Sequence, residues 1–310
     1  MRMSIIFCIA FFMAPFRAGA EDRLQDVARR SMPVVAALHA GRLSGTGFIV
    51  RGDGLLATNY HVVAQVGLNG KVEAQFSNGA AFEGRVTALN REKDIALIQL
   101  ETARRDWPVL PLGSSLSERA GHPVLVIGNP HDRGLNADDG EVTRLYRWIP
   151  QYYPGLLIQI SVPIYSGHSG APLINSDGDI IGMIYRTSME NSNVAVAIPV
   201  EYLKSALAQY EHSGRISSSR LGASVDLLNG LRGGIVHRLE PGFSEKDSTL
   251  RPGDRILSMD GRPLPDSIED TDAAIRLHLM DRAPGETLKV QVARGDRLLD
   301  IPVTLGEERE

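Results

Sequence analysis

Short apolar runs bounded by turn-forming residues fill the sequence between Pro33 and Val200 and limit the folds open to it. They include residues 47–50, 54–58, 95–98, 124–127 and 180–185. Such runs between Gly, Asn, Asp and Pro are typical of strands, and many of them at close spacing indicate a β-barrel or a sandwich. Helical periodicity occurs only at the edges, over residues 24–30 and 200–207. The sequence therefore predicts an all-β domain over residues 21–210.

A second domain follows a polar connection. Residues 211–219 are mostly small or polar and show no apolar periodicity, which is typical of a flexible linker. Beyond them, apolar runs at 234–239, 255–259 and 288–292 alternate with a helical pattern over 270–280. Strands combined with one helix predict a small α+β domain over residues 220–306.

Residues 1–20 have the features of a signal peptide. A basic start precedes an apolar run over 5–13, and Ala18 and Ala20 form the small-x-small pattern that signal peptidase recognises. We expect cleavage after Ala20 and export of the chain. A retained membrane anchor is the alternative, although Arg17 ends the apolar run before the ~20 residues that a spanning helix needs.

Composition excludes several classes of function. The only cysteine, Cys8, lies in the predicted signal peptide, so the mature chain would have no disulfide and no cysteine nucleophile. The net charge of −4 argues against nucleic acid as the main partner. The histidines outside the candidate site show no ligand spacing with acidic residues or thiols, so we expect no metal and no cofactor.

Three segments each place one polar residue at the edge of an apolar run: His61, Asp94 and Ser169. A serine hydroxyl is a poor nucleophile at neutral pH and needs a base beside it, which a third group must hold in one tautomer. Each residue alone is weak evidence, but their order within one predicted β domain predicts a catalytic triad. Ser169 would attack a carbonyl, His61 would transfer the proton, and Asp94 would orient His61.

The turn that contains Ser169 is suited to a second feature that this chemistry requires, an oxyanion-binding site. Glycines beside Ser169 let consecutive backbone N–H groups point into one concavity, where they stabilise an oxyanion. We expect Gly167, His168 and Ser169 to supply these groups. The His168 side chain is expected to face solvent, and a role as a second base or pH sensor is the alternative.

With these motifs, the chain resembles the HtrA/Deg family of serine proteases within the trypsin-like fold. Residues 44–49, 127–130 and 196–199 resemble strand, loop and domain-end segments of that family. The resemblance implies that residues 21–210 form a trypsin-like double β-barrel. The family usually has Asn-Ser-Gly-Gly where this chain has His168-Ser169-Gly170-Ala171, so Ala171 adds a methyl group where backbones approach closely.

The resemblance also implies where the substrate side chain lies. The loop over 186–193 and the strand residues Val194, Ala195 and Val196 would form the wall of the pocket for the side chain that precedes the cleaved bond. That strand carries no acidic residue, which favours small or medium apolar side chains over Lys or Arg.

The second domain resembles a PDZ domain. A Pro-Gly-Asp turn at 252–254 and an Asp-Gly turn at 260–261 are its most telling features. A PDZ domain binds an extended peptide as an added strand and captures the terminal carboxylate with backbone amides. By resemblance the capturing loop is Arg220, Leu221, Gly222 and Ala223. A module that only joins subunits is the alternative.

These features together favour an ATP-independent serine endopeptidase of the cell envelope, exported to the bacterial periplasm. Misfolded or regulatory proteins would be its substrates, C-terminal peptides would bind the PDZ domain, and the family resemblance implies a homotrimer. Two alternatives stay open. One is a catalytically silent holdase or peptide-binding protein, and the other is a membrane-tethered sensor protease.

Overall fold

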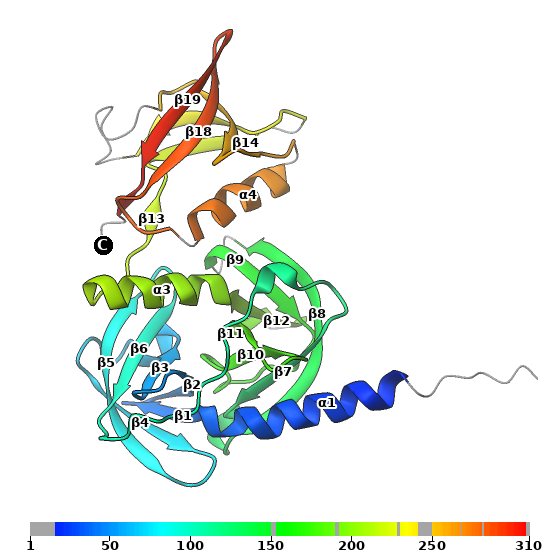
Figure 1. Cartoon of the computed structure of the whole chain (residues 1–310), viewed down its shortest axis with the longest axis vertical. Coiled ribbons are helices and arrows are strands. Elements are labelled where there is room, and N and C mark those ends of the chain that lie inside the picture. Colours follow the sequence, from blue (N-terminus) through cyan, green and yellow to red (C-terminus); the bar gives the residue numbers. More distant parts are fainter. Residues whose placement is uncertain are drawn as a thin grey trace, which may run out of the picture.

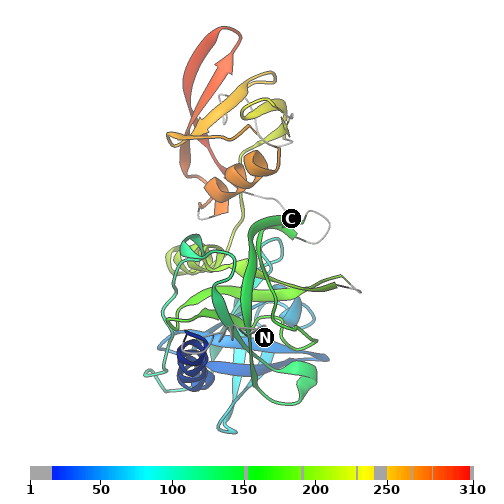
Figure 2. The ribbon, with the colours of Figure 1, turned by 90° about the vertical axis from the view of Figure 1, so that its right-hand side faces the viewer.

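Two closed β-barrels lie side by side, and a smaller domain lies beyond one end of them (Figure 1). The computed structural model describes residues 16–149, 153–189, 192–227, 230–240, 250–266, 268–280 and 282–307. Figure 2 shows the same separation of the parts from the side. The described strands of the barrels confirm the prediction of an all-β domain with two barrels.

The first barrel contains six antiparallel strands in the hydrogen-bonded order β1-β2-β3-β6-β5-β4. They are β1 (Val35–Ala40), β2 (Leu43–Arg51), β3 (Leu55–Thr58), β4 (Lys71–Phe76), β5 (Ala81–Asn90) and β6 (Ile95–Leu100). In β4 exposed and buried residues alternate, because successive side chains of a strand point to opposite faces. Val72, Ala74 and Phe76 therefore face the barrel interior.

The second barrel repeats this architecture in the order β10-β11-β12-β9-β8-β7. Its strands are β7 (Pro123–Gly128), β8 (Asn136–Ile149), β9 (Tyr153–Ile160), β10 (Pro172–Asn175), β11 (Ile180–Met189) and β12 (Ser192–Pro199). One short helix precedes β1, and three others lie in connections between strands. They are η1 (Met32–Val34), α2 (Tyr60–Val63), η2 (Ser115–Ser117) and η3 (Pro130–Asp132).

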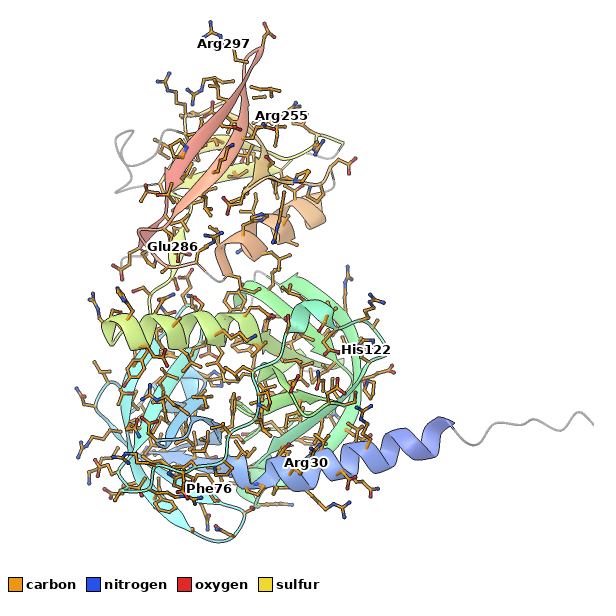
Figure 3. The ribbon with its side chains drawn as sticks, in the orientation of Figure 1. Arg30, Phe76, His122, Arg255, Glu286 and Arg297 are labelled. Carbon is orange, nitrogen blue, oxygen red and sulfur yellow. The ribbon has the colours of Figure 1, made fainter. Side chains whose placement is uncertain are left out.

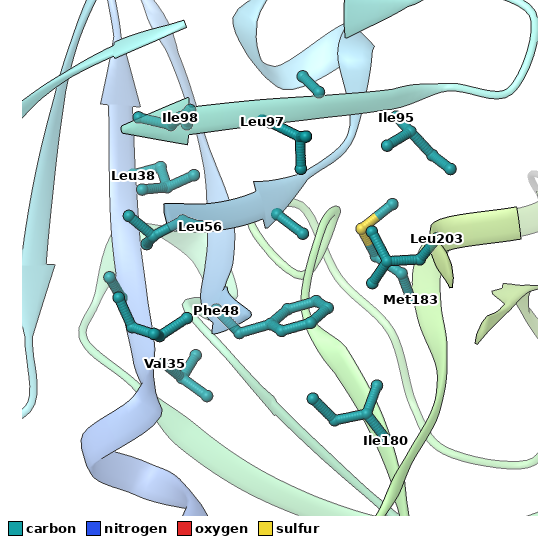
Figure 4. Packing of buried hydrophobic residues seen from close by; sticks show 14 of the residues in the cluster. Val35, Leu38, Phe48, Leu56, Ile95, Leu97, Ile98, Ile180, Met183 and Leu203 are labelled. Atoms are coloured by element: carbon teal, nitrogen blue, oxygen red, sulfur yellow. The ribbon is translucent and has the colours of Figure 1, made fainter. Parts of the chain in front are cut away.

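One hydrophobic core joins the two barrels. Phe48 and Leu97 of the first barrel pack in the same cluster as Ile180 and Met183 of the second, and Leu203 joins them from the following helix (Figure 4). All five side chains are at most 2% exposed. Because a close-packed interior resists deformation, this shared core holds the two barrels in one relative position.

A long helix lies at each end of the barrel pair in the sequence. The first is α1 (Phe16–Ser31), which buries Leu24 and Val27. The predicted cleavage position after Ala20 lies within α1, and residues 1–15 of the predicted signal peptide lie outside the described residues. Among the helices that the structure describes, none has both the length and the apolar character needed to cross a membrane.

The second long helix, α3 (Val200–Ser213), corrects the predicted linker. The helix ends at Gly214, whose φ of 71° is the left-handed conformation favoured at such ends, so residues 211–213 are helical. The remaining connection is attached on both sides. Ile216 is 6% exposed and packs in the barrel core, while Ser217 Oγ donates to Glu307 Oε1 at 2.5 Å. The polar composition suggested flexibility, but tertiary contacts hold this segment.

The smaller domain is built on a twisted sheet in the order β14-β15-β16-β18-β19. Its elements are β13 (Ser219–Arg220), β14 (Ala223–Leu227), β15 (Gly234–Leu239), β16 (Arg255–Met259), β17 (Arg262–Pro263), α4 (Ile268–Met280), β18 (Thr287–Arg294), β19 (Arg297–Thr304) and β20 (Gly306–Glu307). Strands β15, β16 and β18 and the helix α4 lie where the apolar runs and the helical pattern predict them, whereas β14 and β19 were not predicted. Figure 3 shows Arg297 at the far tip of the β18–β19 hairpin. Strand β14 ends the sheet on one side, next to α4.

Candidate active site

Strand pairing in the first barrel brings His61 and Asp94 together. Strands β3 and β6 are antiparallel neighbours with Thr58 opposite Ala96, so the end of β3 lies beside the start of β6. His61 follows β3 on the short helix α2, and Asp94 precedes β6 in a tight turn with a φ of 48°. Two residues separated by more than thirty positions therefore face each other.

The carboxylate of Asp94 holds both the backbone and the ring of His61. Its Oδ1 accepts the His61 backbone N–H at 2.9 Å, and its Oδ2 lies 2.8 Å from Nδ1. The Asp94 side chain is 7% exposed, whereas that of His61 is 43% exposed. An ionised carboxylate can only accept hydrogen bonds, so Nδ1 carries the ring proton and Nε2 keeps a free lone pair. His61 can thus act as a base through Nε2.

The turn around Ser169 needs glycine at two positions. Gly167 and Gly170 have φ of 98° and 85°. A Cβ on Gly167 would lie 2.0 Å from the carbonyl oxygen of Asn129, and one on Gly170 would lie 2.1 Å from that of Thr46. Both the conformation and the lack of space therefore require glycine.

Hydrogen bonds fix the peptide groups of this turn. Thr46 of β2 donates its hydroxyl to Gly167 O at 2.6 Å and its backbone N–H to Ser169 O at 2.8 Å. The backbone N–H of His168 is bonded to Tyr165 O at 3.1 Å. Among the described residues, the N–H groups of Gly167 and Ser169 have no acceptor. Two of the three predicted oxyanion donors are therefore available, and His168 N–H is engaged.

Tyr185 of β11 lies against both Ser169 and His61. The Ser169 hydroxyl donates to the Tyr185 carbonyl oxygen at 3.2 Å. The rings of Tyr185 and His61 form an edge contact with centroids 6.0 Å apart. Tyr185 thus contacts Ser169 through its carbonyl oxygen and His61 through its ring. The Ser169 hydroxyl is directed at that carbonyl oxygen.

Ala171 does not disturb the turn. Its methyl group is completely buried in the core of the second barrel. Its N–H donates to His168 O at 2.9 Å, and its carbonyl accepts the Ile184 N–H at 2.8 Å. The additional Cβ relative to glycine is therefore accommodated by apolar packing.

The sequence matches a trypsin-like peptidase domain over residues 45–183 and a PDZ domain over residues 212–293. A DegP-like periplasmic serine endoprotease of Pseudomonas fluorescens is 28% identical over 313 residues, which cover 94% of this chain and 63% of that protein. A second such protein, from Pseudomonas fulva, is 33% identical over 279 residues, covering 84% of this chain and 55% of that protein. The chain therefore contains a trypsin-like peptidase domain and a PDZ domain and is similar to DegP-like serine proteases. It spans less than two thirds of the length of these two relatives.

Solved structures share the fold of this chain. The HtrA-type protease AlgW with a tripeptide has a TM-score of 0.77 and 21% identity, covering 92% of this chain and 97% of that one. The serine endoprotease from Yersinia pestis has a TM-score of 0.68 and 21% identity, covering 92% and 98%. The double barrel followed by a PDZ domain is therefore a known arrangement.

Two of the predicted pocket residues, Ala195 and Val196, lie in a different environment from the one expected. Ala195 and Val196 are each 1% exposed. Because side chains alternate along β12, Ala195 faces the core of the second barrel and Val196 the core between the barrels. These two side chains form no open wall in this structure. The side chain of Val194 lies outside the described residues, as do those of 186–193.

The predicted carboxylate loop of the PDZ domain is built from buried and charged residues. Leu221 and Ala223 are 5% and 8% exposed and belong to the domain core. Gly222 has a φ of 75°, and Arg220 Nη1 lies 3.5 Å from Glu240 Oε2. The loop leads directly into β14, the edge strand.

His168 differs from the expectation. Its side chain is completely buried rather than facing solvent. The ring lies beneath the turn, with Nδ1 3.0 Å from the Tyr165 N–H nitrogen and Nε2 3.3 Å from Asp138 Oδ2. Position in the sequence next to an exposed loop suggested exposure, but the strand β8 covers the ring.

Sequence reasoning missed three residues of the site. Thr46 lies in a segment that resembles the family, yet nothing in that segment indicates that its side chain spans to the second barrel. Tyr185 and Asp138 lie in strands with no local signal for a contact with the Ser169 turn. Each contact joins different strands or loops, so only tertiary structure could locate it. The described residues contain no group of three or more His, Cys, Asp or Glu arranged to hold a metal ion.

Proposed function

We propose that this chain is a serine endopeptidase in which Ser169 is the nucleophile, His61 the general base and Asp94 the residue that orients it. The observation that carries the proposal is the double contact of Asp94 with His61. With the ring proton on Nδ1, Nε2 has a free lone pair and can act as the base. Tyr185 contacts the His61 ring and accepts the Ser169 hydroxyl, so both residues border the same part of the site. This is the arrangement of proton acceptor and orienting group that a serine nucleophile needs.

In the proposed reaction, the Ser169 hydroxyl leaves the Tyr185 carbonyl oxygen and turns to His61 Nε2. Its Oγ forms a bond to the carbonyl carbon of the substrate while Nε2 takes the proton. The N–H groups of Gly167 and Ser169 stabilise the oxyanion. His61 then gives the proton to the leaving amine as the C–N bond breaks, and water releases the acyl group by the same steps.

Unfolded or partly folded proteins are the proposed substrates, because an endopeptidase without a nucleotide-driven unfoldase must bind extended chains. Small or medium apolar side chains before the cleaved bond remain the proposed specificity. The two Pseudomonas relatives are named as periplasmic proteins, and residues 1–20 have the pattern of a signal peptide, so we propose a periplasmic location. A homotrimer is the proposed assembly, and sedimentation or light scattering would measure it.

The PDZ domain is proposed to bind C-terminal peptides. Its strand β14 lies at the edge of the sheet beside α4, where an extended peptide could add a strand. Residues 220–223 lead into that strand and would capture the carboxylate with backbone N–H groups. Peptides ending in apolar residues are the proposed ligands.

The test is cleavage of casein by the wild-type chain beside Ser169→Ala, with and without peptides that end in apolar residues. We expect the wild type to cleave casein and Ser169→Ala not to cleave it. The peptides should change the rate of cleavage by the wild type. If neither protein cleaves casein at any temperature or pH tried, the peptidase proposal is wrong.

A chaperone-like holdase is the second candidate. The Ser169 hydroxyl is directed at the Tyr185 carbonyl oxygen, so the site as described is a resting one. Suppression of aggregation by Ser169→Ala equal to that of the wild type, with no proteolysis by either, would favour this function.

A further inference from the structure

The side chain of His168 fills a closed space beneath the turn that carries Ser169. It is 0% exposed. The ring lies against Gly128 at the end of β7, where a Cβ would be 2.6 Å from the ring carbon Cδ2. Burial of an imidazole is costly unless its nitrogens have partners, so the contacts of this ring have structural consequences.

The contacts assign the position of the ring proton. The backbone N–H of Tyr165 donates to Nδ1 at 3.0 Å, so that nitrogen carries the lone pair. The carbonyl oxygen of Tyr165 is also 3.2 Å from Nδ1, but a proton on Nδ1 would oppose the Tyr165 N–H and would leave the Nε2 lone pair facing a carboxylate. The ring proton therefore lies on Nε2, which faces Asp138 Oδ2 at 3.3 Å. This tautomer is the opposite of that assigned to His61.

Asp138 anchors the ring to the barrel wall. It lies on β8 opposite Val126 of β7, and its Oδ1 accepts the Asn136 side-chain amide at 3.0 Å. Thr46 holds the turn from the first barrel, whereas Asp138 holds it through His168 from the second. The peptide groups between Tyr165 and Ser169 are thus restrained from two sides.

We propose that the His168 side chain is a positioning residue for oxyanion binding, with Asp138 as its anchor. It does not touch the substrate, and it acts by fixing the directions of the Gly167 and Ser169 N–H groups. This inference rests on the proposed peptidase function. The HtrA/Deg family usually has asparagine at this position. Its side-chain oxygen could accept the Tyr165 N–H in place of Nδ1, but the side chain is too short to reach Asp138 as well.

The first test compares His168→Asn, Asp138→Ala and the double variant on a peptide chosen from the casein sites that the wild type cleaves. We expect kcat to fall by about 10- to 100-fold in each single variant, with KM within about twofold, because oxyanion donors act in the transition state. The kcat of the double variant should be no lower than that of His168→Asn, since both substitutions remove the same contact between His168 and Asp138.

The matched control is His122→Asn. His122 lies in the connection before β7, with its Nδ1 2.8 Å from Glu118 Oε2, and Figure 3 places it at the periphery. Its replacement should leave kcat within twofold of the wild type.

A second test does not depend on activity. Nitrogen-15 NMR of histidine-labelled Ser169→Ala protein should show the Nε2–H tautomer for His168 and the Nδ1–H tautomer for His61. Asp138→Ala should change the His168 signals and leave those of His61 in place.

The outcomes separate the two proposals. An inactive wild type would overturn the peptidase function, and the positioning role with it. An active wild type whose kcat is unchanged by His168→Asn and Asp138→Ala overturns the positioning role alone. Additive losses in the double variant, or a His168 proton found on Nδ1, would also overturn it.

Discussion

Asp94 binds the same histidine through both of its carboxylate oxygens: Oδ1 accepts the His61 backbone N–H at 2.9 Å and Oδ2 lies 2.8 Å from Nδ1. The backbone contact sets the position of α2, and the ring contact sets the tautomer. A single side chain thus decides both where His61 lies and which nitrogen can take a proton.

Asp94→Asn should therefore separate the two contacts. The amide oxygen can still accept the backbone N–H, but the amide cannot stabilise a protonated His61. We expect kcat to fall by about 10³- to 10⁴-fold, with little change in the melting temperature. Glu118→Gln, which alters a similar carboxylate contact with His122, should retain wild-type kcat. Near wild-type activity of Asp94→Asn would contradict the assigned role.

Gly170→Ala should be far more damaging than Gly79→Ala. Both glycines have φ above 80°, but a Cβ at Gly170 would lie 2.1 Å from Thr46 O, whereas one at Gly79 would meet nothing within 4 Å. We expect a loss of unfolding free energy of about 3 kcal/mol or more at Gly170 and about 1 kcal/mol at Gly79. Urea unfolding of both variants measures the difference, and equal losses would show that the turn tolerates a side chain.

Arg294→Ala should destabilise the PDZ domain. Its guanidinium makes two hydrogen bonds, of 2.7 and 2.8 Å, to the completely buried carboxylate of Asp254. Removing it leaves a buried charge without that partner, at a cost of about 3 kcal/mol. Lys289→Ala removes the contact with Asp300 on the adjacent exposed surface and should change stability little. Denaturant titration of both variants is the measurement.

The same pair predicts a loss of stability in acid. Burial opposes the charged form of Asp254, but hydrogen bonds from Arg294 and from the Arg251 backbone outweigh it and hold the pKa below its ordinary value of 3.8. A carboxyl whose pKa is lower in the folded state stabilises the fold above its unfolded pKa and loses that contribution as the pH falls through the folded value. The PDZ transition should thus weaken below about pH 4. Arg294→Ala should show a smaller acid-side change, and an equal one would contradict this assignment.

Ile216→Ala should release the connection between the domains. Its side chain packs in the barrel core, and its carbonyl accepts the Asn90 side-chain amide at 3.2 Å. Arg215 is already exposed, and losing the packing of its neighbour should let the backbone around it adopt the extended form that trypsin binds. We expect faster cleavage after Arg215 in a Ser169→Ala background, with Ile216→Val close to the parent. Equal rates for all three proteins would mean that the connection is open in every case.

The strands, the two domains and the order of His61, Asp94 and Ser169 are visible in the sequence because they depend on local patterns. Alternation of apolar residues along β4, the runs in β6 and β7, and the glycines beside Ser169 each act over a few residues. Side-chain periodicity and turn conformation are properties of short segments, so one sequence is enough to predict them.

Only the tertiary structure decided the surroundings of those residues. Thr46 and Gly167 are joined by a hydrogen bond across 121 positions, and His168 and Asp138 across 30. His168 was predicted to face solvent and the connection around Ile216 to be flexible. Both predictions are wrong, because a loop position or a polar composition indicates exposure only when no distant segment covers the residue. The amino-acid sequence by itself determines which groups are present for catalysis. Packing between the two barrels determined how those groups are held, because such contacts depend on the arrangement of the whole fold.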